Sequence, residues 1–166
     1  MNIFSSNTDP SVHLMDAISG VRPLRILMPS YRSHPFVGGQ GIYLKHLSKA
    51  LVDLGHQVDV ISGPPYPDLE PRVGLIKLPS LDMYAREHPI MSLNWDIIKN
   101  PLDFYEYLVH NSGGFPEPYT FGERLAKYLK DKINAYDNTY DNAYDIVHDN
   151  QTLCYGLLKV REMGLP

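Results

Sequence analysis

Two short apolar runs flank a glycine-rich loop and an amphipathic segment in the first third of this 166-residue chain. The runs are LRILMP at 24–29 and QVDVIS at 57–62, and the loop sequence between them is Gly-Gly-Gln-Gly at 38–41. Short continuous apolar runs suit strands that are buried on both faces, as in parallel sheets. The order strand, loop, helix, strand therefore predicts a parallel α/β unit.

The segment after Gly41 has the spacing of a helix. Its leucines recur at intervals of three, four and three residues, at positions 44, 47, 51 and 54, which places one apolar stripe on a helix surface. Gly55 stands where a C′ glycine terminates a helix, since glycine adopts positive φ without penalty.

Later segments continue the alternation of strands and helices. Strands are predicted at 73–78 and 144–148. Residues 79–118 read as less regular, apart from a helix that starts after Asn100. Helices are predicted to begin at Pro101 after the N-cap Asn100, at a capping box formed by Thr120 and Glu123, and at Thr152.

The length favours a single domain. We expect 1–22 to be a flexible N-terminal extension and 23–166 to form a partial Rossmann-like domain, with a parallel sheet flanked by helices. The last predicted helix is followed by Gly-Leu-Pro at 164–166, which normally leads into another strand. The sheet is therefore expected to be incomplete, with the chain ending in mid-domain.

Composition narrows the function classes. The formal net charge of −4 at pH 7 argues against nucleic acid as a partner. The single cysteine, Cys154, excludes an internal disulfide and favours a cytoplasmic protein, with the inner membrane face as the alternative location.

The near-repeat Asn-Ala-Tyr-Asp at 134–145 is interpreted as an exposed connector. Its aspartates recur every fourth residue, which does not match a calcium-binding loop.

A ligand site follows from the predicted strand order. In doubly wound sheets the fourth strand returns beside the first, and ligands bind outside the carboxyl ends of the strands at that reversal. We therefore predict that Gly38 and Gly39 face Asp149, Asn150 and Gln151 across one crevice. Of the adjacent residues His148 and Asp149, Asp149 is expected to point into it, because neighbouring strand residues point to opposite faces.

The helix after the glycine loop lacks a Ser, Thr, Asp or Asn cap and has no acid in its first turn. Its first amides can therefore bind a phosphate or a sugar, or simply water. The P-loop lysine is absent, and the dinucleotide fingerprint fails because position 44 is leucine and no acid follows the second strand. An NAD(P)-dependent oxidoreductase is the less favoured alternative.

Other candidate residues carry weaker signals. The histidines lack the spacing of a zinc site, so no metal ligands are predicted. The aromatic segment 117–121, EPYTF, could line an acceptor pocket, with ordinary packing as the alternative.

Four groups of residues resemble the N-terminal lobe of family 4 glycosyltransferases. They are LRILMP at 24–29, GGQGIY at 38–43, LGHQV at 54–58, and YDIVHDNQ at 144–151 with GLP at 164–166. The resemblance covers nearly the whole chain. The glycine loop and the Gly-His-x-Val turn are weak signals separately and a specific pair together.

The resemblance implies a GT-B enzyme with two Rossmann-like lobes. Such an enzyme transfers a sugar, with retention, from a nucleotide-sugar donor to a sugar or lipid-linked acceptor, and it needs no metal or cofactor. Gly38 and Gly39 would approach the donor phosphates, with Gln40 and Gly41 beside them.

The same resemblance implies that the expected catalytic histidine lies beyond Pro166. It also implies a C-terminal lobe, missing from this chain, as the partner of the N-terminal lobe. The catalytic residues of the chain are therefore unknown, and the chain alone is expected to be inactive or nearly so. A non-catalytic lobe that binds a sugar or a partner subunit is the alternative.

Overall fold

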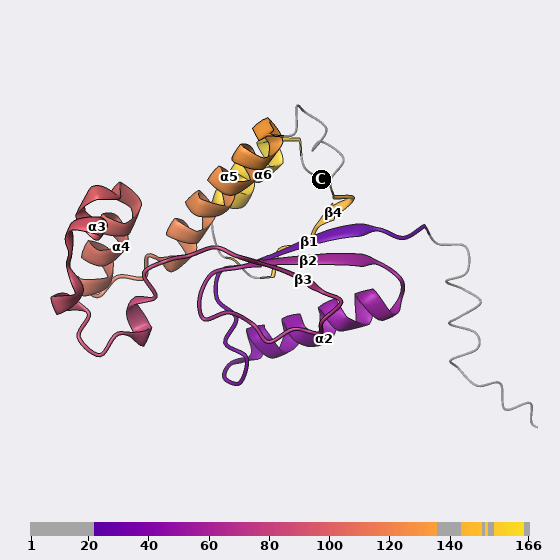
Figure 1. Ribbon diagram of the computed structural model, residues 1–166, viewed down its shortest axis with the longest axis horizontal. Coiled ribbons are helices and arrows are strands. Elements are labelled where there is room, and N and C mark those ends of the chain that lie inside the picture. Colours follow the sequence, from indigo (N-terminus) through magenta and orange to yellow (C-terminus); the bar gives the residue numbers. More distant parts are fainter. Residues whose placement is uncertain (1–21, 136–143, 151, 153–154, 165–166) are drawn as a thin grey trace, which may run out of the picture.

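A computed structural model of the chain describes residues 22–135, 144–150, 152 and 155–164. It contains a four-stranded parallel sheet in the order β3-β2-β1-β4 (Figure 1). The strands are β1 Arg25–Ser30, β2 Gln57–Ser62, β3 Gly74–Lys77 and β4 Ile146–Val147. The predicted Rossmann-like sheet and its reversal of strand order between β1 and β4 are therefore confirmed.

Helices cover both faces of the sheet. One face packs against α2, and α5 and α6 lie together on the opposite face (Figure 1). The helices are α2 Gly39–Asp53, α3 Trp95–Lys99, α4 Pro101–Asn111, α5 Glu117–Ala135 and α6 Gly156–Glu162, with two 3₁₀ turns, η1 Met83–Ala85 and η2 Ile90–Ser92.

Strand β1 forms the centre of the core because its side chains alternate between the two layers. Ile26 and Met28 join the cluster packed by Leu44 of α2. Leu27 joins the cluster packed by Leu125 of α5. All of β1 after its first residue is buried, which explains the continuous apolar run from Ile26 to Pro29.

The predicted capping box at Thr120 and Glu123 is wrong. Helix α5 already begins at Glu117, and the Thr120 amide donates to the Pro116 carbonyl at 3.0 Å. The Thr120 hydroxyl donates back to the Glu117 carbonyl at 3.3 Å. Proline lacks an amide hydrogen and is tolerated in a first helical turn, so Pro118 does not delay the helix.

The interpretation of 79–118 as less regular missed helix α3. The Asn94 side chain accepts hydrogen bonds from the amides of Asp96 and Ile97, each at 3.0 Å, and so caps α3. The structure also shortens the predicted fourth strand and last helix to β4 and α6. The predicted N-terminal extension before Arg22, most of the 134–145 repeat, Gln151 and Cys154 lie outside the described residues.

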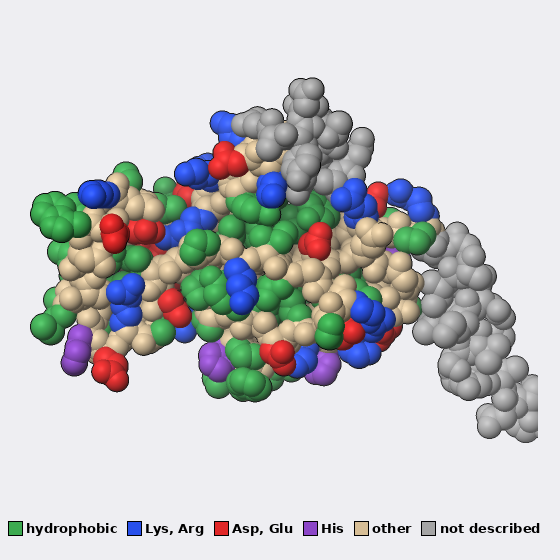
Figure 2. Space-filling view, viewed as in Figure 1, with side chains coloured by type: hydrophobic (Ala, Val, Ile, Leu, Met, Phe, Trp, Pro, Cys, Tyr) green, Lys and Arg blue, Asp and Glu red, His purple; other side chains and the backbone are tan. Residues whose placement is uncertain are grey.

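Helices α3 and α4 form a projection at one end of the molecule (Figure 1). Its own small core contains Met83, Ile97 and Tyr107. Hydrophobic side chains remain on the surface of this end (Figure 2), and Met91 and Trp95 are among the exposed ones, at 82% and 74%.

Helices α5 and α6 approach each other most closely where Gly156 meets Gly122. A Cβ added to Gly156 would overlap the Gly122 backbone. We therefore expect Gly156→Ala to lower the free energy of unfolding by about 1–3 kcal/mol, because rigid backbone must move apart. Urea denaturation of the chain measures this.

Gly39→Ala is the matched control for that substitution. A Cβ at Gly39 meets no atom within 4 Å, so this variant should change stability by no more than about 1 kcal/mol. Equal effects of the two substitutions would contradict the close packing of α5 on α6.

Candidate functional site at the β1–α2 loop

The loop between β1 and α2 presents an uncapped helix start. Gly38 is the N-cap residue, with φ 86° and ψ 153°, and no side chain caps α2. The first turn of α2 contains no acidic residue. This agrees with the start predicted from sequence, except that α2 begins at Gly39, two residues earlier. Such a helix start offers amide hydrogens and a partial positive charge to an anion.

A cavity of about 630 Å³ opens beside this loop. That volume lies within the range of small-molecule sites. The cavity is lined by Arg32, His34, Val37, Gly38, Gly39, Gln40, Gly41, Tyr43 and Asn150. The structure thus brings all four predicted residues of the glycine loop together with Asn150 from the far side of the reversal.

The glycines of the loop serve different physical needs. Gly38 has positive φ, which side chains rarely adopt. Gly41 is buried, and a Cβ there would overlap the His34 carbonyl. Gly39 has neither constraint, since its Cβ position is open and its φ is ordinary. Gly39 is therefore the position where the absence of a side chain leaves room for a ligand.

Asn150 forms the opposite wall and is held by hydrogen bonds. Its side chain, 2% exposed, donates to the Ser30 hydroxyl at 3.2 Å. Its amide donates to the Pro29 carbonyl at 3.1 Å. The Gln40 side chain in turn donates to the Asn150 carbonyl at 3.4 Å. Asn150 therefore holds the two sides of the crevice in a fixed relation.

Asp149 is not among the residues that line the cavity. It is exposed, and its Oδ1 accepts a hydrogen bond from the Thr152 amide at 2.9 Å. This is the local turn contact that aspartate commonly makes. The structure thus brings Asn150 rather than Asp149 to the cavity wall. Gln151 lies outside the described residues, and substrate binding by these residues remains a prediction.

Four cavity residues were not singled out from sequence: Arg32, His34, Val37 and Tyr43. The His34 Nδ1 accepts hydrogen bonds from the amides of Phe36 and Val37, each at 3.1 Å, and so shapes the loop. Arg32 supplies a guanidinium, a strong partner for phosphate. Arg32 and His34 lie in the loop before α2, and Tyr43 lies within the helix. These positions gave no recognised spacing, although a basic residue in a long loop after the first strand was a usable signal.

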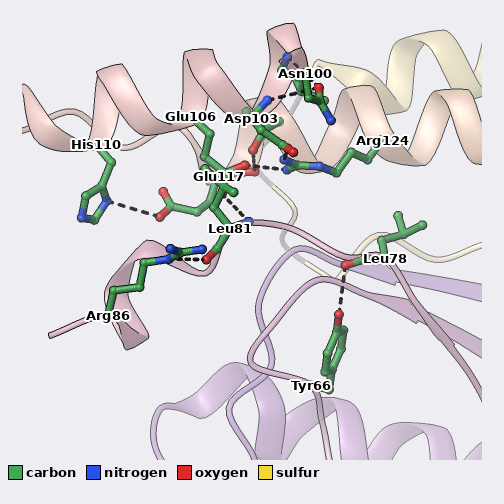
Figure 3. Close-up of polar contacts among 12 residues, drawn as sticks. Tyr66, Leu78, Leu81, Arg86, Asn100, Asp103, Glu106, His110, Glu117 and Arg124 are labelled. Carbon is green, nitrogen blue, oxygen red and sulfur yellow. Dashed lines mark hydrogen bonds and ion pairs between the residues drawn. The ribbon is translucent and has the colours of Figure 1, made fainter. Parts of the chain in front are cut away.

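Helices α4 and α5 are joined by a buried ion pair. Arg124 Nη1 lies 2.6 Å from Glu106 Oε2, and Arg124 Nη2 lies 2.6 Å from Asp103 Oδ1 (Figure 3). The second Glu106 oxygen accepts from the Leu81 amide at 3.2 Å. Glu106 is completely buried, and these contacts compensate for its loss of hydration.

The described residues hold neither a metal centre nor a membrane-spanning helix. No group of three or more His, Cys, Asp or Glu residues in this part of the chain could hold a metal ion. None of its helices is both long and apolar enough to cross a membrane.

The fold and the cavity define a Rossmann-like lobe with an uncapped, glycine-rich helix start at its topological switch point. Residues 37–166 match the family model described as Glycosyltransferase Family 4, and the chain belongs to this family. MMP alpha-(1->4)-mannosyltransferase from Mycolicibacterium hassiacum is 45% identical over 144 residues. The match covers 86% of this chain and 33% of the relative, so the chain spans about a third of that protein's length.

The close approach at Gly41 can be tested directly. We expect Gly41→Ala to lower the free energy of unfolding by about 1–3 kcal/mol, because the new methyl group must displace the His34 carbonyl. Thermal unfolding followed by circular dichroism measures the loss of stability. Gly39→Ala is the control, because its added methyl group meets no other atom. A Gly41→Ala variant as stable as the parent would contradict the loop conformation.

Proposed function

We propose that this chain is the acceptor-side lobe of a glycosyltransferase that transfers a sugar from a nucleotide-sugar donor to an acceptor. The observation that carries the proposal is the open position at Gly39. It lies at the uncapped start of α2 and faces a cavity of about 630 Å³. A donor diphosphate would approach the amides there, and membership in Glycosyltransferase Family 4 supports this assignment.

The chemistry of the cavity suits the charged part of such a donor. The uncapped amides of α2 and the Arg32 guanidinium both favour negative charge. As the bond between the sugar and the diphosphate breaks, negative charge grows on the leaving phosphate. Donors fixed in that position would stabilise it without reorganisation.

The rest of the enzyme belongs to the same proposal. A second Rossmann-like lobe would close over the cavity in a GT-B arrangement and bind most of the donor. Transfer would proceed with retention and without a metal ion, in the cytoplasm or at the inner membrane face. The chain alone is proposed to be inactive, because one lobe cannot enclose the reacting sugar and exclude water.

The relative suggests the sugar. Its name describes an α-(1→4)-mannosyltransferase, and we infer that this chain also serves mannosyl transfer. The acceptor would then present a hydroxyl at position 4 of a sugar ring.

A chimera tests the proposal. This chain would replace the matched region of the Mycolicibacterium hassiacum relative, and the purified chimera would be supplied with mannose- and glucose-bearing nucleotide-sugars. We expect the mannosyl donor to be consumed with formation of a new glycoside, and this chain alone to consume none. A folded chimera that transfers no sugar, or full turnover by this chain alone, would contradict the proposal.

Within an active chimera, Gly39→Val should reduce transfer at least 100-fold, a loss of about 2.7 kcal/mol or more. The valine side chain would occupy the open approach to the α2 amides. Ala50→Val is the matched control, since it adds the same side chain to an exposed position of α2. If Gly39→Val retained the parent's kcat/KM, the assignment of the loop to the donor would be wrong.

A further inference from the structure

A second, much smaller recess lies at the carboxyl ends of the first three strands. Tyr31, Gly63 and Leu78, which directly follow β1, β2 and β3, line it together with Glu117 and Thr120 of α5. Its volume of about 10 Å³ is roughly that of one water molecule or one hydroxyl group. We call it the Glu117 recess.

The Glu117 carboxylate is buried, and no other residue donates a hydrogen bond to it. Its side chain is 12% exposed, and both carboxylate oxygens lack a partner from the rest of the described chain. The nearest basic atom is Nδ1 of His110, which lies 3.8 Å from Oε1 and also lacks a partner. Figure 3 shows Glu117 pointing toward His110.

Glu106, one turn of α4 before His110, is a second buried carboxylate, and it has close polar and charged partners. Glu106 is more deeply buried, yet Arg124 and the Leu81 amide contact its two oxygens. The Arg124 guanidinium lies 2.6 Å from Glu106, whereas the nearest basic atom to Glu117 is 3.8 Å away and belongs to a histidine. An unsatisfied buried acceptor costs stability, and such a cost is expected at sites where a ligand supplies the missing donor.

The surroundings of Glu117 raise its pKa. Burial is the largest cause, and the Glu106 carboxylate acts in the same direction. The backbone amide of Glu117, then His110 and Arg32, act against them and lower the pKa. The titratable and charged groups around it come from several elements: Tyr31 and Arg32 from the β1–α2 loop, Tyr84 from η1, Glu106 and His110 from α4, and Arg124 from α5.

An aromatic rim joins the recess to the glycine-loop cavity. The Tyr84 ring packs edge-on against His110, with centroids 4.7 Å apart, and the Arg32 guanidinium lies 4.6 Å from the Tyr84 centroid. Phe115 packs against Tyr31 at 6.0 Å. Tyr84 and Phe115 are each 50% exposed. Arg32 also lines the larger cavity, and its neighbour Tyr31 lines the recess, so consecutive residues of one loop border the two sites.

We propose that Glu117 binds a hydroxyl group of the acceptor sugar, whose ring lies against the exposed aromatic rim. This inference rests on the proposed function and names the acceptor subsite of the same lobe. The recess has room for one oxygen atom, and an ionised carboxylate only accepts hydrogen bonds.

The charges around the recess select a neutral ligand group. A phosphate or carboxylate would meet the Glu117 carboxylate itself. A cation would meet Arg124, which lines the recess, and Arg32 close by. A hydroxyl donates one hydrogen bond without adding charge, and aromatic side chains beside a few polar groups are typical of small-molecule sites.

The test uses the full chain labelled with 13C at its glutamate carboxyl groups. The Glu117 pKa is measured by NMR without sugar and with saturating D-mannose, D-glucose or D-galactose. A donated hydroxyl hydrogen bond favours the charged form, so we expect at least one hexose to lower the Glu117 pKa. No shift with any of the three would overturn the proposal and leave the recess as a site for water only.

Two variants give the second readout. Glu117→Gln should bind the same hexose at least tenfold more weakly, while its unfolding temperature at pH 7.5 stays equal to or above that of the parent, because a desolvated charge is removed. Glu123→Gln is the matched control on the same helix. It removes a surface carboxylate paired with Lys159 and should leave hexose affinity unchanged.

The outcomes separate the two proposals. Unaltered hexose affinity in Glu117→Gln would overturn the proposed hydroxyl site. If this variant does not fold, the hexose-dependent pKa of Glu117 in the parent chain alone decides between the hydroxyl site and a site for water. A chimera that transfers mannose while hexoses leave the Glu117 pKa unchanged would refute only the acceptor subsite. A hexose-dependent pKa in a chain whose chimera transfers nothing would refute only the glycosyltransferase proposal.

Discussion

The buried hydrogen bonds among Ser30, Ser33 and Asn150 hold the two sides of the topological switch together. The hydroxyls of Ser30 and Ser33 lie 2.6 Å apart, and Asn150 donates to Ser30. All three side chains are essentially inaccessible to water, so each needs these partners. They connect the end of β1, the start of its long loop and the end of β4. The position of the glycine loop relative to Asn150, and with it the shape of the larger cavity, depends on this contact.

The two proposals place donor binding and acceptor binding along the same sheet edge. The glycine loop, with its open position at Gly39, offers amides to a negatively charged donor. The Glu117 recess offers an acceptor-only carboxylate to a neutral hydroxyl. Arg32 borders the cavity and stacks on Tyr84 at the rim of the recess. Groups that favour an anion and a carboxylate that favours a hydroxyl donor therefore lie at the same edge of the sheet. A reaction between a diphosphate donor and an alcohol would need both.

Features with a local physical cause could be predicted from the sequence. The run at Ile26, Leu27 and Met28 is apolar because each residue meets a helical layer, and this identified a parallel sheet with β1 inside it. The uncapped start of α2 was visible in the sequence because no Ser, Thr, Asp or Asn stands near Gly38 to cap it.

Tertiary contacts determine which of the other predicted residues reach the site. Asp149 and Asn150 are neighbours, and contacts with residues distant in sequence, Ser30 among them, bury Asn150 at the cavity. The surroundings of Glu117 come from other segments, among them α4 and the β1–α2 loop. The sequence left 117–121 open between an acceptor pocket and ordinary packing, and it did not identify the Glu117 carboxylate.

The central claim is that the glycine loop receives the diphosphate of a sugar donor. Its most direct test is the 1H–15N NMR spectrum of this chain during titration with inorganic pyrophosphate, which carries the charge of the donor without its nucleotide or sugar. The account predicts that the largest amide shifts occur at Gly39, Gln40 and Gly41, and that Gly113 and Gly164, which have similar positive φ at helix ends, do not shift. Amide shifts concentrated elsewhere, with the loop unchanged at saturating pyrophosphate, would contradict it.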